Sequence, residues 1–155
     1  MGLFVAPQHR AALEGGGNAA LSRFPFVSFS KLARPYGELV TYLAEQGLED
    51  PKIHCSTTLM TIVRMSVDGV GIGSLPVATV ADACARGELL RLDLPSPLPA
   101  MVYDAIWRTS NYPSFCRRVS QLAQACATDY FRTDAEQPRT PLPRVKVWTD
   151  TADKN

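Results

Sequence analysis

The spacing of apolar and polar residues predicts short strands that alternate with helices along the chain. In residues 56–76, hydroxyl side chains precede apolar residues that recur at helical spacing. We expect a helix to begin behind these hydroxyls and to end at Asp68 and Gly69, because glycine closes a helix without a Cβ penalty. The short apolar run that follows contains Gly71 and Gly73, which is typical of a buried strand whose backbone another group approaches closely. The hydroxyl residues are Ser56, Thr57 and Thr58, and the apolar residues are Leu59, Ile62, Val63 and Val67.

The same alternation continues on both sides of this segment. The predicted strands are residues 2–6, 24–29, 52–56, 70–75, 90–94 and 101–107. The other predicted helices are residues 35–47, 77–87 and 113–130. Strands that alternate with helices in this way imply an α/β fold with a mainly parallel sheet, right-handed crossovers and helices on its faces.

Composition narrows the class of protein. A chain of 155 residues can bury an ordinary core without disulfide bonds, and its four cysteines show no C-x-x-C spacing. Three of them, Cys84, Cys116 and Cys126, lie in predicted helices, where small buried thiols are the simpler interpretation, and the fourth is Cys55. The N-terminal residues have the features of neither a signal peptide nor a membrane span. These observations together favour a cytoplasmic location.

Charge and local composition each add one expectation. The formal net charge is +1 and the basic residues are scattered, so there is no basic stripe of the kind that binds nucleic acid. From Asp134 onward the chain becomes polar and rich in proline, which predicts a disordered tail over residues 134–155.

The sequence offers little for catalysis. The chain contains two histidines, and Ser74 does not lie in the Gly-x-Ser-x-Gly elbow that supports a serine nucleophile. His54 and Cys55 are neighbours on a predicted strand, so they point to opposite faces and cannot act as a nucleophile with its base. The glycines at 69, 71 and 73 follow a helix instead of preceding one, which is the reverse of a dinucleotide-binding fingerprint. We therefore expect no enzyme activity, no catalytic residue, no metal site and no cofactor.

Binding is the function that the pattern favours. Two predicted helices begin directly after strands, near residues 30–34 and 56–58, and ligands of open parallel sheets bind outside the carboxyl ends of strands. A helix start presents free N–H groups and a partial positive charge, which suit a carboxylate or a similar anion. The alternative is that the hydroxyls there only cap their own helices, and the sequence leaves both interpretations open.

Several segments, in their order and spacing, resemble one known family. They are the central stretch of residues 56–76, an opening strand at 24–30 (FPFVSFS), a helix, glycine and strand step at 86–92 (RGELLRL) and a further strand at 101–107 (MVYDAIW). Over residues 2–131, this series is similar to the second subdomain of the effector-binding region of LysR-type transcriptional regulators. The resemblance implies a type 2 periplasmic-binding-protein-like fold.

The resemblance also implies a site. The family binds a small-molecule effector in the cleft between two subdomains, at places that correspond to both helix starts and to the end of the glycine-containing strand. The effector-binding residues that it implies are Ser30, Lys31, Ser56, Thr57, Thr58, Gly73 and Ser74. The expected effector is an anion, most simply a carboxylate.

The resemblance further suggests how the chain is organised. It assigns residues 1–23 to a remnant of the first subdomain and the crossover, 24–107 to the second subdomain, and 108–133 to a helix that returns to the first subdomain. We expect an N-terminally truncated member of the family that self-associates through residues 35–56 and would contact DNA only through a helix-turn-helix domain outside this sequence. The alternative is a remnant interaction or dimerisation module with neither ligand nor DNA binding of its own.

Overall fold

The structure is a computed structural model that describes residues 1–104, 106, 112–136 and 142–148. It divides into two compact units. The first contains Met1–Met101 and the segment that starts at Leu142, and the second is Val102–Pro141.

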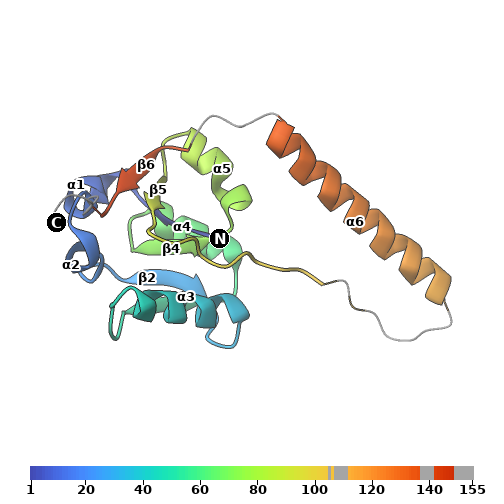
Figure 1. Ribbon diagram of the computed structural model, residues 1–155, viewed down its shortest axis with the longest axis horizontal. Coiled ribbons are helices and arrows are strands. Elements are labelled where there is room, and N and C mark those ends of the chain that lie inside the picture. Colours follow the sequence, from blue (N-terminus) through green and yellow to red (C-terminus); the bar gives the residue numbers. More distant parts are fainter. Residues whose placement is uncertain (105, 107–111, 137–141, 149–155) are drawn as a thin grey trace, which may run out of the picture. The chain divides into compact units, whose positions relative to one another are not determined.

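The first unit is built on a six-stranded sheet in the order β3-β2-β4-β1-β5-β6 (Figure 1). Strand β1 is antiparallel to both of its neighbours, whereas the other pairs are parallel. This confirms the predicted α/β fold with a mainly parallel sheet. The strands are β1 (Gly2–Val5), β2 (Phe26–Phe29), β3 (Ile53–Ser56), β4 (Ile72–Leu75), β5 (Leu90–Asp93) and β6 (Arg144–Lys146).

Three helices connect the parallel strands and end where the sequence predicts. Helix α3 (Arg34–Glu45), α4 (Leu59–Val67) and α5 (Val77–Ala85) are each followed closely by a glycine with a left-handed backbone. These glycines, at 47, 69 and 87, have φ values of 76°, 76° and 73°. A side chain is strained at such angles, so glycine sets the point at which each helix stops. The remaining short helices are η1 (Pro7–His9), α1 (Arg10–Leu13) and α2 (Gly17–Leu21).

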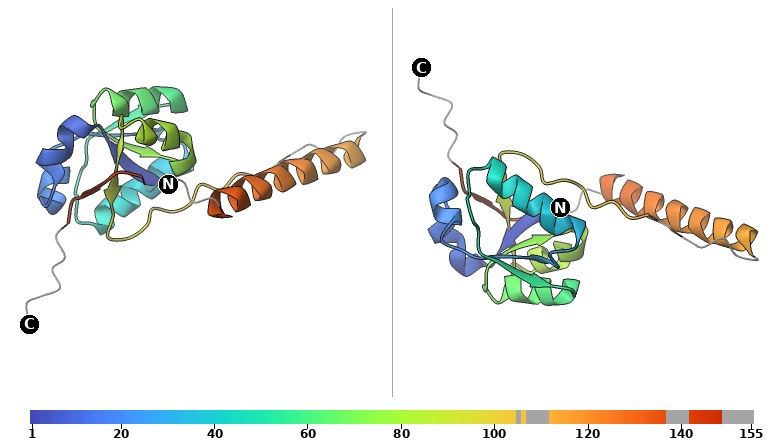
Figure 2. Two further views of the ribbon diagram at one scale, coloured as in Figure 1. Left: turned by 90° about the horizontal axis from the view of Figure 1, so that it is seen from above. Right: turned by 90° about the horizontal axis from the view of Figure 1, so that it is seen from below.

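The core has two parts, one on each face of the sheet. Helix α3 contributes Leu39 and Leu43 to a cluster that includes Phe26, whereas α4 and α5 contribute Ile62 and Val80 to a second cluster. Figure 2 shows α3 and α4 on opposite sides of the sheet. Because successive residues of a strand point to opposite faces, β1, β2 and β4 supply side chains to both clusters.

Two expectations for the chain ends differ from the structure. Residues 1–23 were expected to be a remnant of another subdomain, but β1 lies between β4 and β5 within the same sheet. The tail was expected to be disordered from Asp134, but α6 (Pro113–Glu136) continues past that residue and β6 extends the sheet beside β5. Val145 and Val147 are completely buried, because they alternate with Lys146 as an ordinary strand does. Residues 137–141 and 149–155 lie outside the described part of the chain.

Two further expectations concern the second unit. Residues 101–104 and 106 form no strand, and positions 105 and 107 lie outside the described residues. Helix α6 has the predicted apolar stripe, and Phe115, Val119 and Leu122 on it are exposed. Cys126 of the same helix is exposed as well, contrary to the expected buried thiol, whereas Cys84 of α5 is buried as predicted.

None of the helices in the described residues is long and apolar enough to cross a membrane.

Candidate functional site

Helices α3, α4 and α5 all begin at the same end of the sheet, because each follows one of the parallel strands β2, β3 and β4. We call this region the helix-start end: the carboxyl ends of these strands with the first turns of the three helices. Ser30 and Lys31 lie between β2 and α3, Ser56 is the last residue of β3, and Thr57 and Thr58 lie between β3 and α4. The topology therefore brings five of the seven predicted site residues to one end of the sheet.

The start of α4 has no side-chain cap. Its N-cap residue is Thr58, with extended backbone angles of −108° and 119°, and no side chain accepts a hydrogen bond from the first turn. The Ser56 hydroxyl forms a local turn instead: its oxygen accepts a hydrogen bond from the Thr58 N–H at 3.1 Å and its O–H faces the Thr58 carbonyl at 3.3 Å. The hydroxyls of Thr57 and Thr58 have no hydrogen-bond partner among the described residues. The interpretation that these hydroxyls cap their own helix is therefore wrong.

The starts of α3 and α5 are uncapped in the same way. Their N-cap residues are Ala33 and Pro76, whose side chains cannot accept a hydrogen bond. The Ser30 oxygen faces the Leu32 N–H at 3.4 Å, ahead of the helix, and Lys31 is exposed. No acidic residue occurs in the first turn of α3, α4 or α5. The partial positive charge of these three helix starts is therefore left without a compensating carboxylate from their own first turns.

Gly73 and Ser74 occupy a different position from the other predicted residues. Both lie inside β4, and Ser74 is only 1% exposed. A Cβ atom on Gly73 would lie 2.1 Å from the Ser66 hydroxyl oxygen, and this hydroxyl donates a hydrogen bond of 2.8 Å to the Ile62 carbonyl. Glycine is thus explained here by the close packing of α4 on the sheet.

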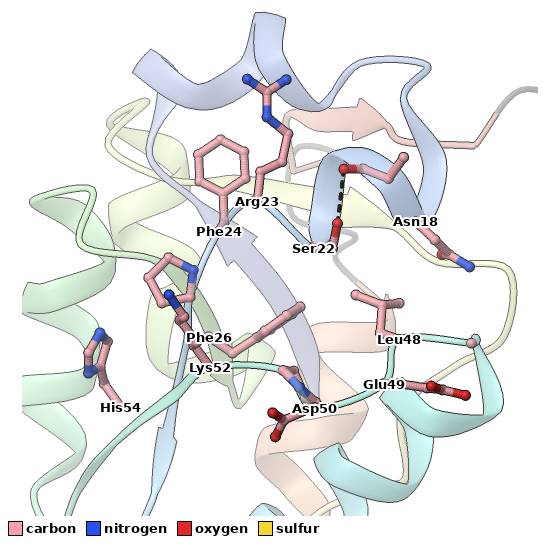
Figure 3. A pocket seen from close by; sticks show the side chains of 14 residues that line it. Asn18, Ser22, Arg23, Phe24, Phe26, Leu48, Glu49, Asp50, Lys52 and His54 are labelled. Carbon is pink, nitrogen blue, oxygen red and sulfur yellow. Dashed lines mark hydrogen bonds between the residues drawn. The ribbon is translucent and has the colours of Figure 1, made fainter.

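A cavity of about 780 Å³ lies at the opposite end of β2 and β3, where these strands begin (Figure 3). Asn18 fixes one side of it: its amide donates to the Gln46 carbonyl at the end of α3, and its side-chain oxygen accepts a hydrogen bond of 3.2 Å from the Trp148 indole. No local sequence pattern marks this cavity, because two distant segments form its walls. It is lined by Asn18, Ala19, Ser22, Arg23, Phe24, Pro25, Phe26, Gly47, Leu48, Glu49, Asp50, Pro51, Lys52 and His54.

Two described residues with raised pKa values lie in different parts of the first unit. Burial raises the pKa of the Cys84 thiol and of the Tyr42 hydroxyl, although Ser96 acts in the opposite direction on Tyr42. These residues belong to α5 and α3 and pack in different core clusters. The register pairs His54 with Val27 and Cys55 with Ser28, so His54 and Cys55 point to opposite faces of β3 as predicted. Among the described residues, no group of histidine, cysteine and acidic side chains could hold a metal ion.

Comparison with known proteins gives a consistent result. The family model for the LysR substrate binding domain matches residues 1–129. The C-terminal domains of a LysR family protein from Agrobacterium tumefaciens str. C58 are 26% identical, with 58% of this chain and 44% of that chain covered and a TM-score of 0.48. For the bromide-bound regulatory domain of HypT from Salmonella typhimurium, the values are 19% identity, 61% and 44% coverage and a TM-score of 0.46.

The effector domain of the regulator AmpR from Pseudomonas aeruginosa is 19% identical, with 58% of this chain and 41% of that chain covered and a TM-score of 0.46. The chain thus spans less than half the length of each of these three structures. None of the curated proteins that were compared matches the sequence. Because the family model covers most of the sequence, the chain belongs to the LysR substrate-binding domain family.

Proposed function

We propose that this chain contributes to the sensing of a small anionic effector, most simply a carboxylate, in a LysR-type transcriptional regulator. The observation that carries the proposal is the helix-start end, where three helix N-termini lack both a side-chain cap and a first-turn acid. Helix N-termini bind anions because their N–H groups and dipoles point toward the ligand. An anion placed there would supply the charge that the helices lack.

The side chains around these helix starts support the same ligand class. Thr57 and Thr58 offer hydroxyls without partners among the described residues, and Lys31 offers an exposed ammonium group with no ion pair there. A hydrogen bond to a charged group is roughly twice as strong as a neutral one, so these groups favour an ionised ligand. Leu32 is 99% exposed and Met60 is 66% exposed beside the same helix starts. We therefore expect the effector to carry an apolar group next to its carboxylate.

A thermal-shift comparison tests this assignment. The chain would be screened with acetate, succinate and benzoate, with sodium chloride at equal ionic strength as the reference. A ligand at about one hundred times its dissociation constant stabilises a protein by about 2.7 kcal/mol. We expect Thr57→Val to reduce the shift given by a bound acid while leaving the unliganded melting temperature almost unchanged, since the Thr57 hydroxyl has no hydrogen-bond partner among the described residues.

The matched control is Thr41→Val, which makes the same change at an exposed position in the middle of α3. It should leave the ligand-induced shift intact. If Thr57→Val retains the full shift of an acid that stabilises the unmodified chain, the site does not include this helix start.

A second candidate function is self-association without a ligand. It is favoured by the position of β3, which is an outer strand of the sheet with His54 and Cys55 exposed. An unpaired strand edge can pair with another chain. Sedimentation velocity at increasing concentration would show a dimer if this surface associates, and a monomer at all concentrations up to the high micromolar range would contradict it.

A further inference from the structure

We infer that the cavity at the start of β2 and β3 is a second binding site, and that it takes a small zwitterion such as an α-amino acid with an apolar side chain. Its volume of about 780 Å³ lies within the range of about 300 to 1,000 Å³ that is usual for small-molecule sites. It is distinct from the helix-start end, because α3 begins at one end of β2 and terminates at the other, beside Gly47 and Leu48 of the cavity wall.

The charges of the cavity wall are of both signs, and they are not used within the described part of the first unit. Arg23, Lys52, Glu49 and Asp50 line the cavity, and none of their side chains forms an ion pair or a hydrogen bond with a described residue. The same unit pairs its charges elsewhere. The pairs are Arg10 with Glu14, Arg34 with Glu38, Arg64 with Asp68, Arg86 with Glu88, and Arg144 with Asp93.

The positions of these charges suit a ligand that carries both signs. Figure 3 shows Lys52 and Asp50 on neighbouring parts of the lower wall, whereas Arg23 points upward away from them and Glu49 extends to the other side of Asp50. A carboxylate would bind near Lys52, and an ammonium group near Asp50. Hydrogen bonds between ionised partners are the strong ones, and a ligand with one charge would leave one of these two groups without a partner.

The floor of the cavity is apolar and held in place. Phe26 and Leu48 line it and belong to the core cluster on the α3 face, whereas Phe24 lies beside Arg23 at the upper edge. The hydrogen bonds of Asn18 to Gln46 and Trp148 join the wall above this floor to the end of α3 and to the segment after β6. When the walls of a site are already ordered in the free protein, binding costs less conformational entropy. The floor therefore accommodates the apolar side chain of an amino acid.

Isothermal titration calorimetry on the full chain with L-leucine tests the proposal. Two probes each remove one charge from the same carbon skeleton: 4-methylpentanoate lacks the amino group, and 3-methylbutylamine lacks the carboxylate. We expect each to bind at least about ten-fold more weakly than L-leucine, because each loses one charge-assisted interaction. Equal affinity for L-leucine and either probe would overturn the zwitterion assignment, and so would the absence of heat from L-leucine at millimolar concentration.

Variants then locate the site. Asp50 has a positive φ of 49°, a conformation that asparagine also tolerates, so Asp50→Asn removes the charge without backbone strain. Asp50→Asn and Lys52→Gln should each weaken L-leucine about ten-fold, with unchanged melting temperatures. Asp82→Asn and Lys146→Gln make the same changes at exposed positions outside the cavity and should have no effect. If L-leucine instead loses affinity in Thr57→Val and not in Asp50→Asn, it binds at the helix-start end, and the inference of a second site is wrong while the proposed function stands.

Discussion

The two ends of strands β2, β3 and β4 are built in opposite ways. At the end where β2 and β4 begin, the backbone is tightly closed: Ile72 donates a hydrogen bond of 2.9 Å to the Pro25 carbonyl, and Gly71 packs against the same oxygen. At the helix-start end, three helices begin without caps, and hydroxyl and ammonium groups lack partners among the described residues. The comparison indicates that close packing holds β2 against β4 at one end, beside the cavity at the start of β2 and β3, while the helix-start end leaves its helix N-termini uncapped.

The largest effect is expected where the chain is most tightly closed. A Cβ atom on Gly71 would lie 2.3 Å from the Pro25 carbonyl oxygen, and this backbone atom cannot rotate away as a side chain can. Gly71→Val should therefore lower the free energy of unfolding by about 3 kcal/mol or more, measured by urea denaturation. Overpacking of a well-filled site generally costs 1 to 3 kcal/mol, and a clash with fixed backbone belongs at the upper limit of that range.

Gly37→Ala is the matched control for this substitution. Gly37 lies within α3, and a Cβ atom there would meet no atom within 4 Å. Alanine is more favourable than glycine in a helix, so this variant should gain about 0.5 to 1 kcal/mol. If both variants change stability by the same amount and in the same direction, close packing at Gly71 is not what holds the beginning of β4 in place.

A smaller loss is expected for the residue that joins three segments at the cavity. Asn18→Ala removes the hydrogen bonds to the Gln46 carbonyl and from the Trp148 indole. Each partner is at least partly buried, so the loss should be about 2 kcal/mol in the same denaturation experiment. Ser22→Ala, which removes one exposed hydrogen bond to the Ala19 carbonyl, serves as the control and should cost only a few tenths of a kcal/mol. A similar cost for both variants would mean that Asn18 does not tie the C-terminal segment to this end of the sheet.

Local signals were sufficient to predict most of the fold between β2 and β5. Helix period and strand alternation identified α3, α4 and α5, and the glycines at 47, 69 and 87 gave their ends, because both signals depend on nearby residues. The pairing of β1 between β4 and β5 was not predictable in this way, since the partners of a strand can be far away in sequence. The pattern of Val145, Lys146 and Val147 is that of a strand, but the prolines before it led to the prediction of a disordered tail.

The candidate site was predictable to a smaller extent. Parallel strands follow from the alternation of strands and helices, and their parallel pairing brings Ser30 and Thr57 to one end of the sheet as expected. The alternative that the hydroxyls cap α4 was wrong: Thr58 occupies the N-cap position with an extended backbone, but no side chain there accepts a hydrogen bond from the first turn. The cavity was missed altogether. Its walls come from residues near 18–26 and 47–54, and only the folded sheet brings these segments together.

The smallest expected effect tests the electrostatics of the helix-start end directly. Met60 is the second residue of α4 and is 66% exposed, so Met60→Glu places a carboxylate beside the uncapped N–H groups without disturbing the core. A carboxylate in a first helical turn stabilises a helix by about 0.3 to 1 kcal/mol at low salt. Glutamate and methionine have similar helix propensities, so a gain of this size would report the charge.

Met60→Gln is the neutral control, and it should leave the free energy of unfolding nearly unchanged. The advantage of Met60→Glu over Met60→Gln should decline as sodium chloride is raised to 1 M, where charges on the surface are screened within about 3 Å. The same carboxylate would occupy the position proposed for the effector, so any acid that stabilises the unmodified chain should stabilise Met60→Glu less. A glutamate that gives neither a gain in stability nor a loss of acid binding would show that the starts of the helices carry no usable positive charge. The contrast between the two ends of the sheet would then reduce to a difference in packing alone.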